Sequence, residues 1–214
     1  MTLTTMFKTA LKKDFQACFA AITFSTLASC STPITTAVES NTAAGQTRAE
    51  NCVYDRAELL ALNIADFDQD IEGGWRSVAN QVGCFDAAAD LIRDYHAALP
   101  QKSFLLYWHE GQVRAITGDY ATAIPLYEMS YKRQDDTVGW NQYVDATIAF
   151  VRRDKTALAK AYFALANLPA PVNAQLDQNG NSIADSWPPN MNVVEDLLAC
   201  FDQQYREAYQ NCRL

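Results

Sequence analysis

The stretch GDYATAIPLY, residues 118–127, decides the fold that we expect of this chain. A glycine and an acid precede Tyr120, an alanine follows three residues later, and Tyr127 comes four residues after that. Apolar residues at spacings of three and four share one face of an α-helix. The stretch therefore predicts a helix that begins near Tyr120, and its wider meaning depends on whether it recurs.

The pattern does recur, at a step of 35 residues in both directions. The aligned positions are Gly83, Gly118 and Arg153 before the helix, Ala88, Ala123 and Leu158 inside it, and Ile92, Tyr127 and Tyr162 four residues further on. An aromatic segment of helical spacing precedes each copy, and a break follows each one. A helical hairpin that recurs at this period is typical of an α-solenoid.

On these residues the chain resembles a tetratricopeptide-repeat (TPR) protein, with the closest match at 118–127. The resemblance implies an all-α fold, a TPR-like α-solenoid of about three helical hairpins with capping helices. We expect repeats at about 70–100, 105–135 and 140–170, a first helix over 53–68, and a C-terminal loop and cap over 171–214. Pro125 falls inside a predicted helix and costs least near its start. The alternative is an irregular helical bundle whose small residues happen to align.

The N-terminal residues predict an export signal. Lys8, Lys12 and Lys13 precede a mostly apolar run over 15–27, which is too short to span a membrane and has the length of a signal sequence. The residues that follow, Leu27-Ala28-Ser29-Cys30, resemble the lipobox of bacterial lipoproteins. The resemblance implies removal of 1–29 and acylation of Cys30. The alternative is an ordinary secretory signal cut near Ser29.

The resemblance to lipoproteins also implies an address. Residue 31 is a serine rather than an aspartate, which favours the outer membrane over the inner one, with the folded part facing the periplasm. Residues 30–50 contain few large apolar side chains, so we expect a lipidated flexible tether there, followed by a helical-repeat domain over 51–214. Membrane contact is expected through the lipid alone.

The charge balance excludes one class of partner. Without residues 1–29, the number of basic residues falls from 17 to 14 and that of acidic residues from 25 to 24, a net charge of about −10. Because an acidic chain repels phosphates, we expect no nucleic-acid binding.

Four cysteines remain after the signal and Cys30 are set aside. An even number in an oxidising compartment predicts two disulfides, for which three pairings are possible. We favour Cys52–Cys84 and Cys200–Cys212; the alternative is four unpaired buried thiols. The second pair requires the last helical segment to break near Phe201, because a continuous helix would hold its cysteines about 18 Å apart. We expect Asp202 to cap the helix after the break.

The first helix of each TPR repeat lines a concave groove, and the resemblance carries this role to specific positions. We expect the partner-binding residues to be Ser77, Asn80, Gln81, Leu105, Trp108, Gln112, Trp140, Tyr143 and Thr147. Aromatic side chains beside amides suit peptide binding. The alternative for Trp108 and Trp140 is packing between helices. These positions hold no lysine or arginine, so we do not expect a clamp on a carboxylate.

Sequence patterns for catalysis or metal binding are weak. The two histidines, His96 and His109, are far apart in sequence, and His109 and Glu110 point about 100° apart on a helix. We expect no catalytic residue and no required cofactor. A polar turn resembles the calcium loops of thrombospondin type 3 repeats, with Asp177, Asn179, Asn181 and Asp185 as candidate ligands. The alternative is an ordinary Asn-Gly turn.

The sequence as a whole predicts a lipid-anchored scaffold that binds a protein or peptide in the cell envelope. Two alternatives stay open: an envelope hydrolase with an unrecognised carboxylate site, and a structural module stabilised by calcium. The hydrolase requires titratable groups that converge in the groove, and the calcium module requires a stability that depends on the metal.

Overall fold

The computed structural model describes residues 52–133, 136–170 and 187–212. These residues form helices joined by turns, and none of them lies in a β-strand. The prediction of an all-α fold is therefore confirmed. None of the helices in these three ranges has the length and apolar content needed to cross a bilayer.

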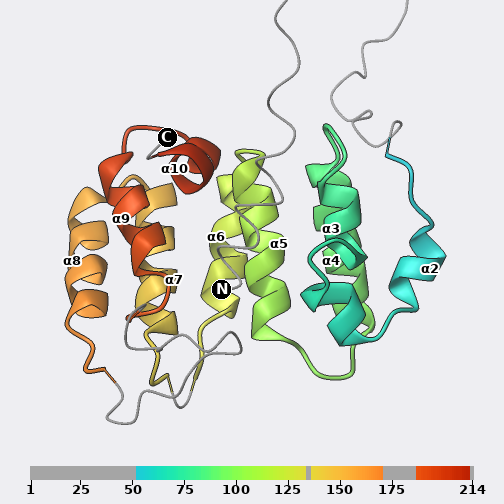
Figure 1. Cartoon of the computed structure of the whole chain (residues 1–214), viewed down its shortest axis with the longest axis horizontal. Helices are drawn as coiled ribbons and strands as arrows, with labels where there is room; N and C mark the ends of the chain where they lie inside the picture. The colour runs from blue at the N-terminus through green and yellow to red at the C-terminus, as the bar shows by residue number, and fades with distance from the viewer. Residues whose placement is uncertain (1–51, 134–135, 171–186, 213–214) are drawn as a thin grey trace, which may run out of the picture.

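Six of the helices form three consecutive hairpins that stand side by side (Figure 1). The hairpins are α3 (Gly74–Ala79) with α4 (Phe85–Ala98), α5 (Phe104–Ile116) with α6 (Tyr120–Met129), and α7 (Trp140–Val151) with α8 (Lys155–Ala166). The two helices of each hairpin pack along each other, and α4 also packs on α5 and α6 on α7. The chain thus builds a continuous row from sequence neighbours.

The 35-residue step reappears in the coordinates, because α4, α6 and α8 begin at Phe85, Tyr120 and Lys155. Two residues before each helix, the backbone is left-handed, with φ of 81° at Gly83, 85° at Gly118 and 59° at Arg153. A Cβ at Gly118 would meet no atom within 4 Å, so the backbone angle rather than crowding favours glycine. Arg153 adopts the same conformation at a cost of about 1–2 kcal/mol.

The buried face of each hairpin follows the same step. Ala88, Ala123 and Leu158 are fully buried, as are the large side chains Trp75, Tyr127 and Phe150. Aromatic residues therefore supply the largest side chains of the core. Pro125 is the sixth of the ten residues of α6 and lies on its exposed side, past the first turn, where a proline costs least.

The prediction of one helix over 53–68 is wrong. The segment contains α2 (Arg56–Leu60) and a separate π-helical turn, η3 (Ala65–Gln69). Asn63 interrupts it, since its side-chain oxygen accepts hydrogen bonds from the backbone N–H groups of Ala65 and Asp66. The interruption turns η3 back onto α4, where Phe67 stacks on Tyr95 with ring centroids 3.6 Å apart.

The C-terminal residues form the expected broken cap. Helix α9 (Met191–Ala199) and helix α10 (Tyr205–Asn211) flank a turn at Phe201, which confirms the predicted break. Asp202 does not cap α10, because the N-cap position belongs to Gln204. Trp187 precedes α9 and donates its Nε1–H to the carbonyl of Leu168, 3.0 Å away, which ties the cap to the end of the third hairpin.

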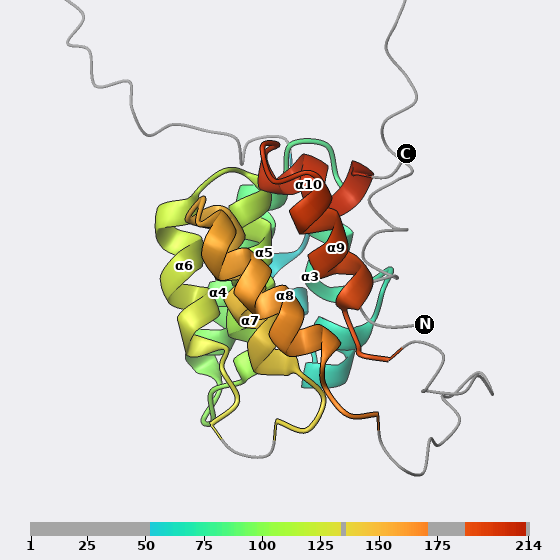
Figure 2. The same cartoon turned by 90° about the vertical axis from the view of Figure 1, so that its left-hand side faces the viewer.

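Both favoured disulfides are present. Cys52 bonds Cys84 at the start of α4, and Cys200 bonds Cys212 across the two cap helices. Helix α9 packs on α7 and α8, while α10 reaches across to α5 (Figure 2). The last helix thus returns to the middle of the row instead of extending it.

Candidate functional site

A cavity of about 340 Å³ lies where the C-terminal cap meets the second and third hairpins. One face of α5 supplies its longest wall, with Phe104, Leu105, Trp108, His109 and Gln112. Trp140 and Tyr143 of α7 form the facing wall. The spacing along α5 is helical, so a single face of this helix points at the cavity.

Trp108, Trp140 and Tyr143, which we call the aromatic wall, pack against one another and also line the cavity. The ring of Trp108 contacts those of Trp140 and Tyr143, with centroids 5.1 Å and 4.6 Å apart. Trp140 also donates its Nε1–H to the carbonyl of Ser130 over 2.8 Å. The packing between helices that was the alternative for these tryptophans is therefore present, and the same rings also face the cavity.

Only part of the predicted groove lies at this cavity. Leu105, Trp108, Gln112, Trp140 and Tyr143 line it, all from the second and third hairpins. The remaining positions have other surroundings. The Ser77 hydroxyl donates to the carbonyl of Gly74, and the buried Thr147 hydroxyl donates to that of Tyr143. The Gln81 amide donates to the carbonyl of Val53 and accepts from its N–H. Asn80 is the C-cap residue of α3.

A buried polar cluster forms the end of the cavity nearest the first hairpin. We call Asp68, Trp75, Arg76 and His109 the inner cluster. Asp68 Oδ1 lies 2.6 Å from His109 Nδ1 and accepts the Trp75 Nε1–H over 3.0 Å. Arg76 donates an Nη1–H to the backbone carbonyl of Asp68 and stacks its guanidinium on the ring of Trp75. Every member is at least 96% buried, and Arg76 and His109 line the cavity.

Local backbone geometry explains how Asp68 reaches His109. The π-helical turn η3 lies against the first residue of α3, Gly74, which has a φ of 51°. A Cβ at Gly74 would lie 2.0 Å from the carbonyl oxygen of Phe67, so only glycine permits this approach. The close contact places the Asp68 carboxylate beside Trp75 and His109, which belongs to α5.

Opposing effects set the charges of the inner cluster. Burial raises the pKa of Asp68, but the His109 ring, the Arg76 charge and the Trp75 N–H outweigh it, so the pKa lies below its ordinary value of 3.8. Burial lowers the pKa of Arg76, and the nearby Asp68, Tyr209 and Asp70 offset this only in part. Asp68 is therefore an anion, and it lies beside the Arg76 cation.

The cavity contains cations that the sequence analysis did not expect. Arg76 and Lys132 both line it, and Lys132 Nζ lies 5.2 Å from the ring centroid of Phe104. Neither residue belongs to the positions inferred from the TPR resemblance, which themselves hold no lysine or arginine. No Asp or Glu is among the described residues that line the cavity.

Buried tyrosines from the cap close the cavity on a further side. Tyr209 of α10 lines it next to Gln112 and Tyr143, and its ring stacks on Tyr205, 5.5 Å away. Burial raises the pKa of Tyr209, and it raises that of Tyr205 to about 12. These hydroxyls are therefore neutral donors and acceptors at physiological pH.

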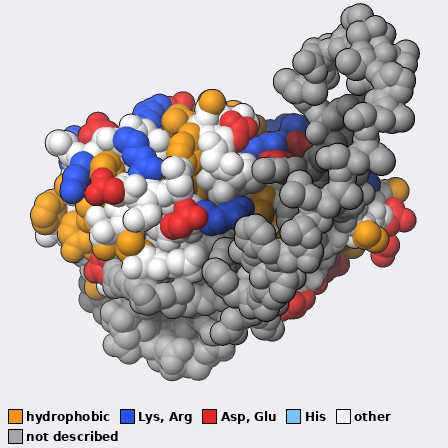
Figure 3. Space-filling model, turned by 90° about the horizontal axis from the view of Figure 1, so that it is seen from above, with side chains coloured by type: hydrophobic (Ala, Val, Ile, Leu, Met, Phe, Trp, Pro, Cys, Tyr) orange, Lys and Arg blue, Asp and Glu red, His pale blue; other side chains and the backbone are white. Residues whose placement is uncertain are grey.

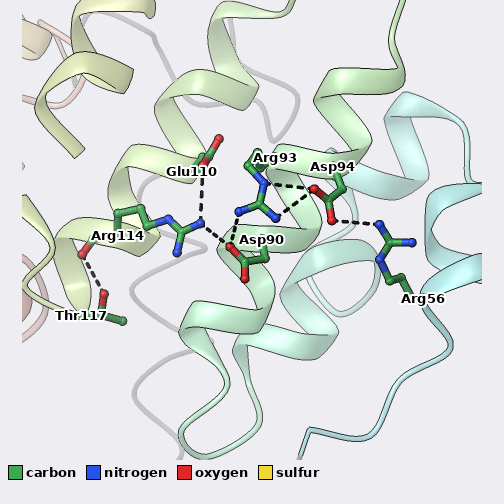
Figure 4. A network of polar contacts seen from close by, with 7 residues as sticks. All are labelled: Arg56, Asp90, Arg93, Asp94, Glu110, Arg114 and Thr117. Carbon is green, nitrogen blue, oxygen red and sulfur yellow. Dashed lines mark hydrogen bonds and ion pairs between the residues drawn. The ribbon is translucent and has the colours of Figure 1, made fainter. Parts of the chain in front are cut away.

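The opposite side of α5 carries a second set of charges, which we call the outer network (Figure 4). It consists of Arg56, Asp90, Arg93, Asp94, Glu110 and Arg114. Arginines and carboxylates alternate along the network. Its ion pairs connect α2, α4 and α5. Its paired carboxylates each face an arginine and lie outside the cavity, so they do not form the convergent acid site that a hydrolase would require.

Several predicted features lie outside the described residues. These are the lipidation site Cys30 with the signal and the tether, and the calcium candidates Asp177, Asn179, Asn181 and Asp185. Within the described ranges, no group of three or more His, Cys, Asp or Glu side chains is placed to hold a metal ion.

The sequence pointed to the aromatic wall but not to the inner cluster. Asp68 and His109 are 41 residues apart, and neither belongs to a recognisable motif. Comparison with protein-family models, with curated proteins and with solved structures finds no match for this chain. The function is therefore inferred from the sequence and from the geometry of this cavity.

Proposed function

We propose that this protein is a lipid-anchored, TPR-like helical-repeat scaffold that faces the periplasm and binds a protein or peptide partner in the cell envelope. One observation carries the binding role, namely the cavity whose walls are an aromatic face of α5 and its counterpart on α7. The anchor and the address rest on the signal-like N-terminus and on Cys30, and the TPR-like class rests on the 35-residue step.

The composition of the cavity supports recognition of a peptide side chain. Trp and Tyr bury large areas while keeping one polar atom, which is why they dominate the energetics of interfaces. Here Trp108, Trp140 and Tyr143 meet the amide of Gln112 within a volume of about 340 Å³. Ligand sites in proteins begin at about this volume, so the cavity suits one or two side chains rather than a folded domain.

The proposal is tested by capturing crosslinked partners from intact envelopes. Trp140→Ala is the preferred variant because Trp140 is only partly buried, whereas Trp108 is 3% exposed and its loss would endanger folding. The matched control is Phe163→Ala, an aromatic residue of α8 that is 62% exposed and does not line the cavity.

We expect Trp140→Ala to lose a partner that the wild type and Phe163→Ala retain, with circular dichroism showing that both variants are folded. Equal capture by all three proteins would contradict the proposal. The expected loss in affinity is at least about tenfold, since truncation of a central aromatic residue in an interface costs about 2 kcal/mol or more.

One observation favours a hydrolase as a second candidate. The Asp68 carboxylate holds the His109 ring at the cavity wall, and an oriented imidazole is a general base for water. No Ser, Thr or Cys is among the lining residues that the structure describes, so the nucleophile would be water. Turnover of activated esters by the wild type, lost in His109→Gln, would establish this candidate, and equal background rates would eliminate it.

A further inference from the structure

The inner cluster gives the cavity a chemical preference beyond apolar contact. The chain has 25 acidic and 17 basic residues, yet the charged side chains among the described cavity residues are both basic, Arg76 and Lys132. Asp68, a buried carboxylate beside Arg76, does not line the cavity and is hydrogen-bonded to His109 and Trp75. A cationic cavity in an acidic protein attracts an anion and disfavours a cation.

His109 adds a polar atom at the same wall. Its Nδ1 faces Asp68, and among the described residues no hydrogen-bond partner is seen for Nε2, although the ring is 4% exposed and lines the cavity. Because Nδ1 faces Asp68, Nε2 is the ring atom that can contact a ligand in the cavity.

The depth of these groups indicates how the anion enters. Arg76 and His109 are each 4% exposed, whereas Lys132 is half-buried and Val138 is 38% exposed. A carboxylate that reaches Arg76 therefore has to be carried inward on a short apolar stem, between walls that include Phe104 and Trp108. An acidic side chain provides that stem, whereas a chain end would also bring its last peptide group against apolar walls, where unpaired N–H and C=O groups are costly.

We propose that the cavity binds an acidic side chain of the partner, flanked in the partner's sequence by an aromatic or large apolar residue. Arg76 and His109 face the carboxylate at the inner end, and Lys132 lies on its route. Trp108 and Trp140 contact the apolar neighbour. This inference rests on the proposed function, because it names the part of the partner that enters the same cavity.

The test uses the full chain and three short peptides, with calorimetry to measure Kd. The peptides are acetyl-Phe-Glu-Phe-amide, acetyl-Phe-Gln-Phe-amide and acetyl-Phe-Gln-Phe with a free carboxylate. We expect the Glu peptide to bind at least about tenfold tighter than the neutral Gln peptide, because only its carboxylate makes charged hydrogen bonds. Increased salt should reduce this difference.

A pair of lysine variants localises the effect. Lys132→Gln should weaken binding of the Glu peptide by about threefold and leave the Gln peptide unchanged, as expected for a partly exposed charge. Lys160→Gln removes the same charge from an exposed position of α8 away from the cavity and should change neither affinity. Equal losses in both variants would overturn the inference.

Three other results would also overturn it: equal affinity for the Glu and neutral Gln peptides, tighter binding of the peptide with the free chain end, or binding of none of them at millimolar concentration. Equal affinity would leave the proposed function standing, because apolar contacts would then suffice. Absence of peptide binding would leave the proposed function to be judged by the crosslinking of Trp140→Ala, so the two failures remain distinguishable.

Discussion

The two sides of α5 shift the pKa of a buried carboxylate in opposite directions. On the inner side, Asp68 meets His109 and Trp75 at 2.6 Å and 3.0 Å, and its pKa lies below the ordinary value. On the outer side lies Glu110, which follows His109 in α5 and is 4% exposed. Its Oε1 lies 3.8 Å from Arg114 Nη2, and burial raises its pKa.

Burial opposes the charge of both groups, so burial does not explain the difference. Close hydrogen-bond donors explain the opposite pKa shifts. Asp68 accepts hydrogen bonds from the rings of His109 and Trp75, whereas Glu110 has one ion pair, with Arg114 at 3.8 Å. A charged site in a protein interior needs donors already in position, and only the inner side of α5 has them. The outer network connects α2, α4 and α5, whereas the inner cluster places Arg76 and His109 at the wall of the cavity.

The largest predicted effect comes from the two disulfides together, because each one holds a segment on a different side of α5. Cys52–Cys84 holds the segment that brings Arg56 to the outer network, and Cys200–Cys212 holds α10, which brings Tyr209 to the cavity. Their loops span 32 and 12 residues, so loop entropy predicts losses of about 4 and 3 kcal/mol on removal.

This is measured as the free energy of unfolding in urea for the double variants Cys52→Ser/Cys84→Ser and Cys200→Ser/Cys212→Ser. Reductant should lower the Tm of the wild type and leave a variant without either bridge unchanged. A Tm of the wild type that does not respond to reductant would show that the four cysteines are unpaired in solution.

The next effect is the loss of the inner carboxylate. Asp68→Ala should lower the free energy of unfolding by about 3–5 kcal/mol, because it leaves the buried Arg76 charge without its nearest anion. Asp94→Ala in the outer network is the matched control and should cost at most about 1 kcal/mol, since that pair is partly exposed. Comparable losses in the two variants would remove the distinction between the two sides.

The loss of stability in acid should also depend on the Asp68 carboxylate. Folding lowers the pKa of Asp68, so its stabilising contribution is complete above the ordinary value of 3.8 and disappears as pH falls through the lower native pKa. Urea titrations between pH 7 and pH 2.5 should therefore show less acid-induced loss in Asp68→Ala than in the wild type. A parallel decline in both proteins would contradict the assignment.

The sequence predicted the repeated hairpins because the 35-residue step marks helix starts directly, down to Arg153 in place of a glycine. It also predicted the aromatic wall, since Trp108 and Trp140 lie on first helices of hairpins. The inner cluster was missed for a physical reason. Asp68 reaches His109 only because Asn63 interrupts a helix-like segment, and a regular helix over 53–68 would have aimed it elsewhere.

A change of opposite sign is expected at Glu110. Because folding raises its pKa above the ordinary 4.5, the native state favours the protonated form, and the associated stability is lost as pH rises through the native pKa. Glu110→Gln should therefore leave stability at pH 7 unchanged or raise it by up to about 1 kcal/mol. A loss above about 2 kcal/mol would mean that Arg114 depends on this carboxylate rather than on Asp90.

The smallest effect is predicted at the exposed end of the outer network. Arg56 donates to Asp94 over 2.9 Å, and this hydrogen bond is the main cause of the lowered pKa of Asp94. Arg56→Ala should raise that pKa and cost about 0.2–1 kcal/mol of unfolding free energy, and 1 M salt should erase most of the difference. The pKa is measured by NMR titration of the Asp94 carboxylate, and an unchanged value would show that Arg93 alone sets it.

Photocrosslinking in intact envelopes shows directly whether the inner side of α5 faces a partner. A photoreactive amino acid replaces Val138, which lines the cavity and is 38% exposed, or Met129, which is 48% exposed and does not line it. The account predicts a discrete crosslinked product at position 138 that the Trp140→Ala variant lacks, and no such product at position 129. The same product at both positions, or a product at 129 alone, would contradict it.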